Sequence, residues 1–177
     1  MTFTILSGIG YPLLILGLAQ AFFPDQADGS LIRRDGKVIG SALIGQSFDN
    51  PRYFWGRPSA SAPTPYNAAA SSGSNLAPSN PQLARDVAAR SAALVKAHGN
   101  SGAPIPVDLV TASGIGLDPH LTVAAMLYQV DRVAASRHLE PSAVRALVEQ
   151  HVEQPTLGFI GERRVNVLAV NLALDGR

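Results

Sequence analysis

The first twenty-four residues of the chain contain no charged side chain and no histidine, since the first such residue is Asp25. The apolar core from 5 to 23 has nineteen residues. A helix of that length spans about 29 Å, close to the hydrocarbon thickness of a bilayer. Pro12 lies inside it, where it would break a soluble helix but is tolerated in a membrane helix. Residues 1–24 therefore predict a transmembrane anchor.

Two other interpretations of this segment stay open from the residues alone. Ala19 and Ala21 form the small-residue pattern of a signal-peptide cleavage site, although the usual basic residues before it are missing. A core helix of a soluble protein would show a polar face, and this segment shows none. We favour the anchor, in which Gly17 and Ala21 offer a small-residue face for packing against another helix.

The composition argues against several classes of function. The formal net charge is +1, and no block of Lys and Arg forms a phosphate-binding stripe, which argues against nucleic acid as a partner. The chain has no cysteine, so it has no disulfide, thiolate metal site or cysteine nucleophile. Residues 25–177 are long enough for one soluble domain.

Strand and helix patterns mix along residues 25–177, which predicts a mixed α/β domain. Asp35 and Gly36 between two apolar runs predict a hairpin with strands at 31–34 and 38–46. A helix is expected from Pro81, capped by Ser79 or Asn80 and closed by Gly99, and strands are expected at 107–112 and 165–174. A helix at 122–138 should have Ala124, Leu127, Val130 and Ala134 inward. A further helix from Pro141 should have Val144, Leu147, Val148 and His151 on one face.

A stretch without charge, YNAAASSGSNLAPSNP, occupies residues 66–81. A phosphate-binding loop of the Walker type would need a lysine after its glycine, and this stretch has none. Asparagine and serine side chains fix turns by bonding the local backbone, so we expect an ordered loop. The weak nucleotide-binding candidates are Ser72, Gly73, Ser74 and Asn75, and the candidates for partner contact are Arg57, Tyr66, Asn67, Asn75 and Asn80.

No catalytic or metal-binding pattern stands out in the sequence. The four histidines form no metal-ligand pair of the His-Glu-x-x-His kind. The Asp118 carboxylate could orient the imidazole of His120 for catalysis or metal binding. An aspartate before Pro119 fits better with a turn that starts a helix. We therefore expect no catalytic residue, no metal site and no tightly bound cofactor.

Six longer stretches follow one another across nearly the whole chain: YPLLILGLAQAFFPDQADGSLI, GSALIGQSF, YFWGRPSA, YNAAASSGSNLAPSNP, PVDLVTASGIGLDPHLT and RVNVLAVNLAL. Together they resemble the C-subunit family of the bacterial Kdp potassium-transporting P-type ATPase. The resemblance implies a single-pass protein of the bacterial inner membrane that is not an enzyme on its own. It also implies three partners, namely an ATP-hydrolysing subunit, a channel-like potassium-binding subunit and a small helical subunit.

The function implied by the resemblance is that of an accessory subunit in a high-affinity, ATP-driven potassium import complex. Such a subunit is needed for assembly and acts as a catalytic chaperone that raises the ATP affinity of the ATP-hydrolysing subunit. ATP would then reach this chain only through a site shared with that subunit. One alternative is a cap or gate over the potassium entrance without nucleotide contact. Another is a secreted binding domain, which requires cleavage after Ala21.

Charge pattern and resemblance disagree about the side of the membrane on which the domain lies. Arg33, Arg34 and Lys37 follow the apolar segment, and the positive-inside rule would place them in the cytoplasm. The resemblance implies a domain on the outer, periplasmic side. We expect the periplasmic side.

Overall fold

The structure is a computed structural model that describes residues 1–99 and 102–176. It contains two compact units, Met1–Leu43 and Ile44–Arg177. The first unit holds the apolar helix together with the hairpin that follows it. The second holds the mixed helix and sheet domain, in which the candidate site lies.

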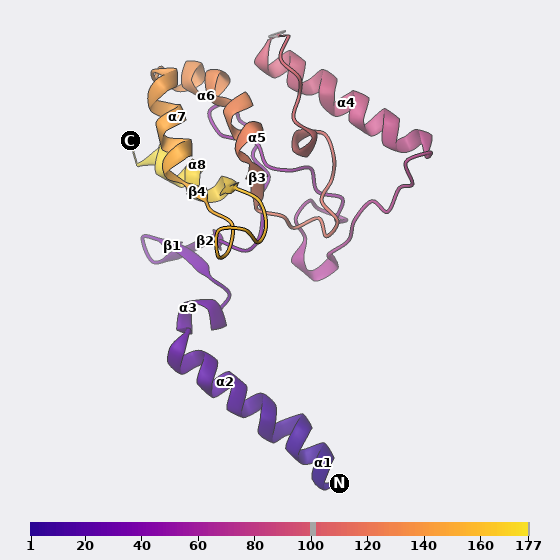
Figure 1. Ribbon diagram of the computed structural model, residues 1–177, viewed down its shortest axis with the longest axis vertical. Helices are drawn as coiled ribbons and strands as arrows, with labels where there is room; N and C mark the ends of the chain where they lie inside the picture. Colours follow the sequence, from indigo (N-terminus) through magenta and orange to yellow (C-terminus); the bar gives the residue numbers. More distant parts are fainter. Residues whose placement is uncertain (100–101, 177) are drawn as a thin grey trace. The chain divides into compact units, whose positions relative to one another are not determined.

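The first unit begins with a continuous apolar helix from Thr2 to Phe22 (Figure 1), none of whose side chains is buried. One turn before Pro12 the helix widens into a π-helix, because the proline ring lacks an N–H and clashes with the carbonyl one turn back. The expected single N-terminal apolar helix before a mixed domain is confirmed. Its parts are α1 (Thr2–Ile5), the π-helix η1 (Leu6–Gly10) and α2 (Tyr11–Phe22), and a short helix α3 (Pro24–Ala27) follows.

The hairpin predicted around Asp35 and Gly36 is confirmed, but its second strand ends at Ser41 and does not reach residue 46. Strand β1 (Leu31–Arg34) pairs antiparallel with β2 (Lys37–Ser41). Asp35 and Gly36 have φ angles of 52° and 75°, as a two-residue turn with left-handed backbone at both central positions requires.

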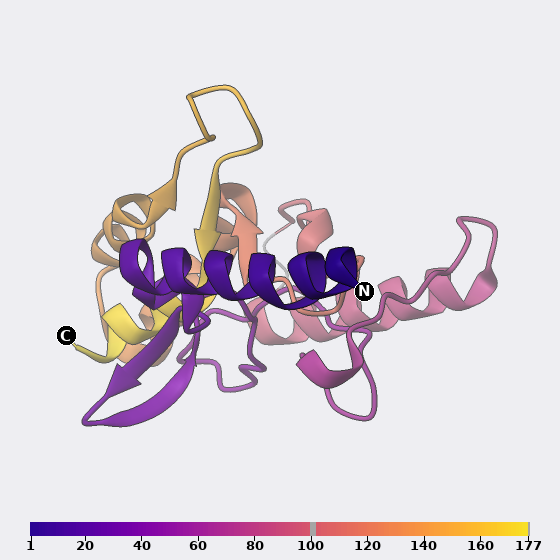
Figure 2. The ribbon, with the colours of Figure 1, turned by 90° about the horizontal axis from the view of Figure 1, so that it is seen from below.

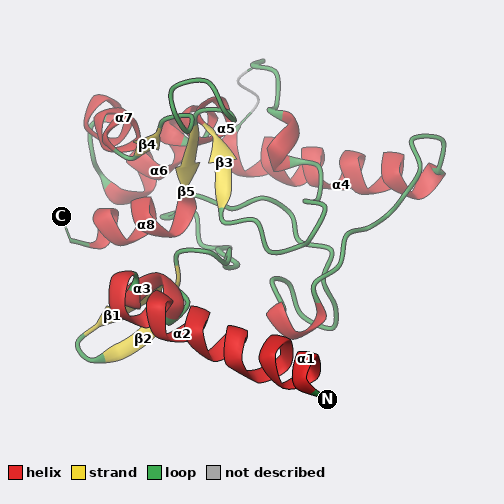
Figure 3. Cartoon of the chain, turned by 60° about the horizontal axis from the view of Figure 1, so that its bottom comes forward, coloured by secondary structure: helices red, strands yellow, loops and turns green. Residues whose placement is uncertain are grey.

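The second unit combines a small antiparallel sheet, in the order β3-β5-β4, with helices that pack around it (Figure 1). Figure 3 shows that the chain between β2 and α4 is mostly loop. The strands are β3 (His120–Thr122), β4 (Val152–Glu153) and β5 (Arg164–Asn166). The helices are η2 (Ala68–Ala70), α4 (Pro81–His98), η3 (Val107–Leu109), α5 (Val123–Tyr128), α6 (Val130–Arg137), α7 (Pro141–Gln150) and α8 (Val167–Asp175), of which η2 and η3 are 3₁₀ turns.

Helix α4 has the predicted bounds, and helix α7 has the predicted start but ends before His151, which was expected on its face. In α4 the Asn80 side chain accepts the N–H of Gln82 at 2.9 Å, Pro81 occupies the first turn, and Gly99 follows the last residue with a φ of 72°. Helix α7 begins at Pro141 as expected. It buries Val144, Leu147 and Val148, while His151 after its end is half-buried.

Two predicted strands are wrong. Residues 107–112 contain the turn η3 and no strand. Of residues 165–174, only the first two continue β5 and the rest form α8, because the Asn166 side chain accepts the N–H of Ala169 at 3.1 Å and caps a helix. A short run of buried apolar residues fits a strand and a buried helix equally well.

The helix predicted at 122–138 is interrupted. Gln129 separates α5 from α6. Leu127 is half-buried and packs against the core, in agreement with the prediction. Ala124 is exposed, contrary to the prediction, and Ala125 and Met126 are fully buried instead. Val130 and Ala134 in α6 are buried as predicted.

The core of the second unit lies between the sheet and helices α5 to α8. Phe54, from the loop-rich region, is fully buried in it although it belongs to no helix or strand. The buried cluster to which Phe54 belongs also includes Met126, Val130, Val133, Val144, Val148, Val165, Val170 and Leu174.

Two buried side-chain amides hold the extended backbone at Phe54 and Trp55. Asn171 in α8 accepts the N–H of Phe54 at 2.9 Å and donates to its carbonyl at 2.9 Å. Gln129 accepts the N–H of Trp55 at 2.8 Å and donates to its carbonyl at 3.1 Å. Each amide therefore replaces a neighbouring strand, and the segment needs no sheet to satisfy its buried backbone.

Arg132 links Gln129 to the side chains of His98 and Trp55. Its guanidinium donates to Gln129 at 2.8 Å and to His98 at 3.0 Å, and it lies 4.4 Å from the centre of the Trp55 ring. Burial lowers the pKa of Arg132 to about 10. The same guanidinium thus fixes the side chain of Trp55, whose backbone Gln129 binds.

We expect Asn171→Leu, which keeps the shape of the side chain and removes its hydrogen bonds, to lower the free energy of unfolding by about 2–4 kcal/mol. The reason is that one buried donor and one buried acceptor of Phe54 lose their partners, at about 1–3 kcal/mol each. Denaturant unfolding of the detergent-solubilised chain, followed by the fluorescence of its single tryptophan, measures the change.

The control is Gln82→Leu, which removes an exposed amide from α4 and should leave stability within about 0.5 kcal/mol. If Asn171→Leu behaved like this control, the amides would not be what holds the segment.

Candidate partner-binding site

A row of charged side chains crosses the second unit next to the sheet. Arg57 contacts the Asp118 carboxylate at 3.1 Å, and the other oxygen of Asp118 lies 3.8 Å from the His120 ring. The far nitrogen of His120 lies 3.4 Å from Glu153, which also pairs with Arg164 at 2.9 Å. This charged row consists of Arg57, Asp118, His120, Glu153 and Arg164.

The strands bring the members of the charged row together. Glu153 in β4 and Arg164 in β5 are direct partners in the antiparallel ladder. His120 opens β3, which pairs with the opposite edge of β5. The predicted turn at Asp118 is present, since its carboxylate accepts the N–H of His120 at 3.0 Å, but it starts a strand and not a helix.

Asp118 keeps its negative charge in this row. Partial burial raises the pKa of its carboxyl, but hydrogen bonds from His120 and Arg57 and the positive charge of Arg57 outweigh burial. The net effect lowers the pKa of Asp118 below its ordinary value. Arg57 therefore faces a permanent carboxylate at neutral pH.

A polar hollow of about 380 Å³ is lined by four members of the charged row, Arg57, Asp118, His120 and Arg164. Besides members of the row, the chain around Glu162 and Arg163 borders it. Its walls therefore carry both signs of charge, and few of them are apolar. The lining residues are Arg57, Asp108, Asp118, His120, Leu121, Thr122, Glu162, Arg163 and Arg164.

The uncharged loop after Arg57 is an ordered structure built on two serines. Ser59 accepts the N–H of Tyr66 at 2.9 Å and donates to the carbonyl of Gly116 at 2.6 Å. Ser61 accepts the N–H of Asn67 at 2.9 Å. The Tyr66 hydroxyl donates to the carbonyl of Arg57 at 2.5 Å, so this loop folds back onto the start of the charged row.

Close backbone contacts join this loop to residues 113–117. A side chain at Gly73 would strike the carbonyl of Gly114, and one at Gly116 would strike the carbonyl of Ser72. Ser71 donates to the carbonyl of Ile115 at 3.0 Å. Glycine is required at these positions because the two loops touch backbone to backbone.

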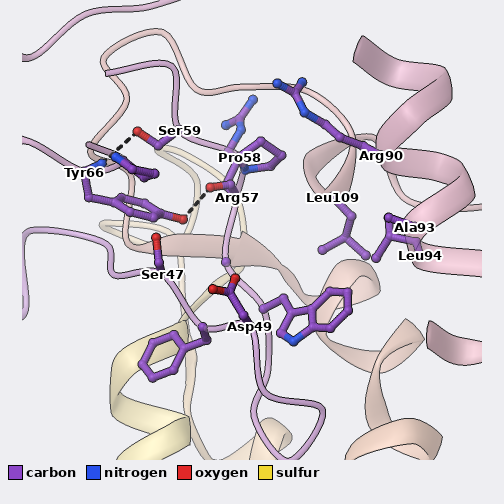
Figure 4. A pocket seen from close by; sticks show the side chains of 14 residues that line it. Ser47, Asp49, Arg57, Pro58, Ser59, Tyr66, Arg90, Ala93, Leu94 and Leu109 are labelled. Atoms are coloured by element: carbon purple, nitrogen blue, oxygen red, sulfur yellow. Dashed lines mark hydrogen bonds between the residues drawn. The ribbon is translucent and has the colours of Figure 1, made fainter. Parts of the chain in front are cut away.

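A second hollow of about 370 Å³ lies between this loop and α4, and Figure 4 shows the side chains around it. Tyr66 and Trp55 supply aromatic surface, while Arg57 and Arg90 bring positive charge. Burial, followed by the negative charges of Asp118 and Asp49, raises the pKa of Tyr66 to about 12, so its hydroxyl stays protonated. Arg57 borders both hollows.

The sequence-predicted partner residues lie in different places. Arg57 and Tyr66 are hydrogen-bonded to each other, and Asn67 caps the turn η2 through the N–H of Ala69 at 3.0 Å. Asn80 caps α4 and belongs to that helix. Asn75 is exposed and has a φ of 49°, a left-handed conformation that asparagine tolerates.

The nucleotide candidates do not lie at a helix start. Ser72, Gly73 and Ser74 belong to no helix or strand and lie between η2 and α4, next to the loop at 113–117. In the described part of the chain, no group of three or more His, Asp or Glu side chains is arranged to hold a metal ion.

Sequence reasoning missed Glu153 and Arg164 as members of the site. Neither belongs to a motif, and they meet only because β4 pairs with β5. These strands have two and three residues, too few to form a recognisable sequence pattern. The one sequence signal was the spacing of Asp118 and His120.

Comparison with known proteins identifies the family of the chain. The family model KdpC, described as "K+-transporting ATPase, c chain", matches residues 1–176. The chain is similar to the protein named "Potassium-transporting ATPase KdpC subunit" of Sorangium cellulosum, with 57% identity over 176 residues, 99% of this chain and 93% of that protein.

Proteins with the same name in two other bacteria are equally similar. In Methylibium petroleiphilum the identity is 58% over 177 residues, covering 100% of this chain and 93% of the relative. In Burkholderia orbicola it is 59% over 172 residues, covering 97% and 89%. The chain therefore belongs to the KdpC family, the c chain of the K+-transporting ATPase.

Proposed function

We propose that the chain is an accessory subunit, needed for assembly, of a high-affinity, ATP-driven potassium import complex in the bacterial inner membrane. The family match from residue 1 to 176 carries this proposal, because it includes both the apolar helix and the folded domain. The expected partners are an ATP-hydrolysing subunit, a channel-like potassium-binding subunit and a small helical subunit.

The apolar helix is the proposed anchor. From Thr2 to Phe22 it is long and apolar enough to cross a bilayer, and none of its side chains is buried in the chain. Gly17 has open space around it, and it lies one helical turn before Ala21. This pair leaves room for the backbone of a partner's helix.

The proposed role in ATP use is indirect. We expect the domain to lie on the periplasmic side and to raise the ATP affinity of the ATP-hydrolysing subunit through the assembled complex. Two features support an effect without a bound nucleotide of its own. The stretch at Ser72 and Gly73 is packed against another loop, and it lacks the lysine of a phosphate-binding loop.

The domain is also proposed to be non-catalytic. The charged row contains paired side chains, in which Arg57 binds Asp118 and Arg164 binds Glu153. A hydrolytic site would need a nucleophile, a base and a group that stabilises developing charge around one open position. Thr122 lines the same hollow as His120, but its hydroxyl accepts the N–H of Ala125 at 3.3 Å and caps α5.

Replacing Gly17 and Ala21 together by isoleucine should reduce recovery of the complex from detergent, because the larger side chains prevent close helix approach. The measurement is co-purification of the partner subunits with a tagged chain. The control is Leu14→Ile with Leu18→Ile, which keeps the size of two exposed side chains of the same helix. Equal recovery of both variants would place the helix contact elsewhere.

The purified full chain, without partner subunits, should not hydrolyse ATP above background. Phosphate release in a preparation free of the other subunits measures this, with the intact complex as the positive control. Turnover that persisted through purification and was abolished by His120→Ala would overturn the non-catalytic assignment.

Asn75→Lys should impair assembly or potassium-dependent ATPase activity of the complex while the domain stays folded. The reason is that an unpaired charge buried in an interface costs several kcal/mol. Asn75→Asp also adds a charge but tolerates the left-handed backbone, so it should impair assembly as well. Asn75→Gly, which adds no charge, is the control and should assemble normally. If Asn75→Lys left assembly intact and tightened nucleotide binding, Ser72 to Asn75 would be a phosphate site.

A further inference from the structure

The loop between β4 and β5 exposes three large apolar side chains together. Leu157 is 78% exposed, Phe159 77% and Ile160 53%. Figure 2 shows this loop projecting from the rest of the domain. We call Leu157, Phe159 and Ile160 the apolar tip. Apolar side chains exposed singly are ordinary, but a contiguous group on one projecting loop indicates a binding surface.

The apolar tip is held in one conformation by backbone hydrogen bonds. Thr156 and Ile160 exchange two of them, each 2.9 Å long, and the N–H of Gly158 binds the carbonyl of Pro155 at 2.9 Å. The three side chains are therefore presented from a closed turn. A surface that is ordered beforehand loses less entropy when a partner binds.

The tip also carries backbone strain that folding does not explain. Leu157 has a φ of 55°, in the left-handed region that disfavours residues with a Cβ, and Gly158 next to it has a φ of 84°. Because the Leu157 side chain is mostly exposed, it gains little from packing inside the domain. A strained residue with no internal benefit points to a function outside the chain.

The apolar tip adjoins the polar hollow of the candidate site. Glu162 and Arg163 continue the same loop, Arg164 begins β5, and all three line that hollow. Within the described residues, neither Glu162 nor Arg163 takes part in an ion pair. The surface thus has an apolar centre with a rim of both charges, which is the anatomy of a protein interface.

We propose that the apolar tip inserts into an apolar socket on a partner subunit of the transport complex, with a carboxylate at the edge of the socket to pair with Arg163. This inference rests on the proposed function, since it requires a multi-subunit assembly. The rim favours a protein over a lipid surface, because the acidic Glu162 lies beside the basic residues. A loop that binds anionic lipid would carry only basic flanks.

The test removes the apolar tip and measures assembly. In the full chain, Leu157→Asn with Phe159→Ser should weaken association with the partner subunits by about tenfold or more, as for a residue group at the centre of an interface. The melting temperature of the chain should not fall. Val107→Ser, which removes an apolar side chain 63% exposed elsewhere on the domain, is the matched control and should assemble normally.

Leu157→Gly separates docking from folding. Glycine relieves the left-handed strain and removes the side chain, so the melting temperature should be equal or higher while association weakens. Unchanged association in both the double variant and Leu157→Gly would overturn the proposal. If these variants assemble normally but the Gly17 and Ala21 variant does not, the proposed function survives and only the docking tip is lost.

A spin label identifies what covers the tip. The chain has no cysteine, so Thr156→Cys provides a single labelling site beside the tip. The label should be mobile in the chain alone in lipid nanodiscs and immobilised in the whole complex. Immersion of the label in lipid without partners would make the membrane the occupant, and immobilisation that appears only at high chain concentration would make it a second copy. Either result would overturn the proposal.

Discussion

The extended backbone at Phe54 and Trp55 is completed by two buried amides, Asn171 and Gln129, and the rest of the second unit is arranged around that contact. Without it, four backbone groups would be buried with no partner, because no strand lies beside them. The amides let a loop run through the core between α8 and the junction of α5 and α6. Gln129 makes this possible by interrupting the helix at the position where its side chain is needed.

The same contact places the candidate site. Arg57 follows two residues after Trp55, so its position is fixed by the amide that binds the Trp55 backbone. The Arg57 guanidinium forms an ion pair with Asp118, and the Arg57 carbonyl accepts a hydrogen bond from the Tyr66 hydroxyl. The charged row, the uncharged loop and both hollows thus meet at one residue, whose location depends on the core.

The features that could be predicted from the sequence are those that depend on residues close together along the chain. The apolar helix, the hairpin at Asp35 and Gly36, and the start of α4 at Pro81 are local, and all are confirmed. The sequence did not predict α8, because alternating branched residues suit a buried strand as well as a helix and only the cap at Asn166 decides. The link from His120 through Glu153 to Arg164 needs a pairing of strands distant along the chain, which no local pattern encodes.

The position of Asn171 has a consequence for the order in which the protein is made. It lies 117 residues after Phe54, in helix α8. A ribosome therefore releases the segment at Phe54 long before the helix that completes its hydrogen bonds has been synthesised. Until α8 emerges, the backbone groups of Phe54 have no partner, so folding of the nascent domain depends on this helix. Closing so long a loop is also slow, so the core around Phe54 is completed only after α8 has been synthesised and has folded.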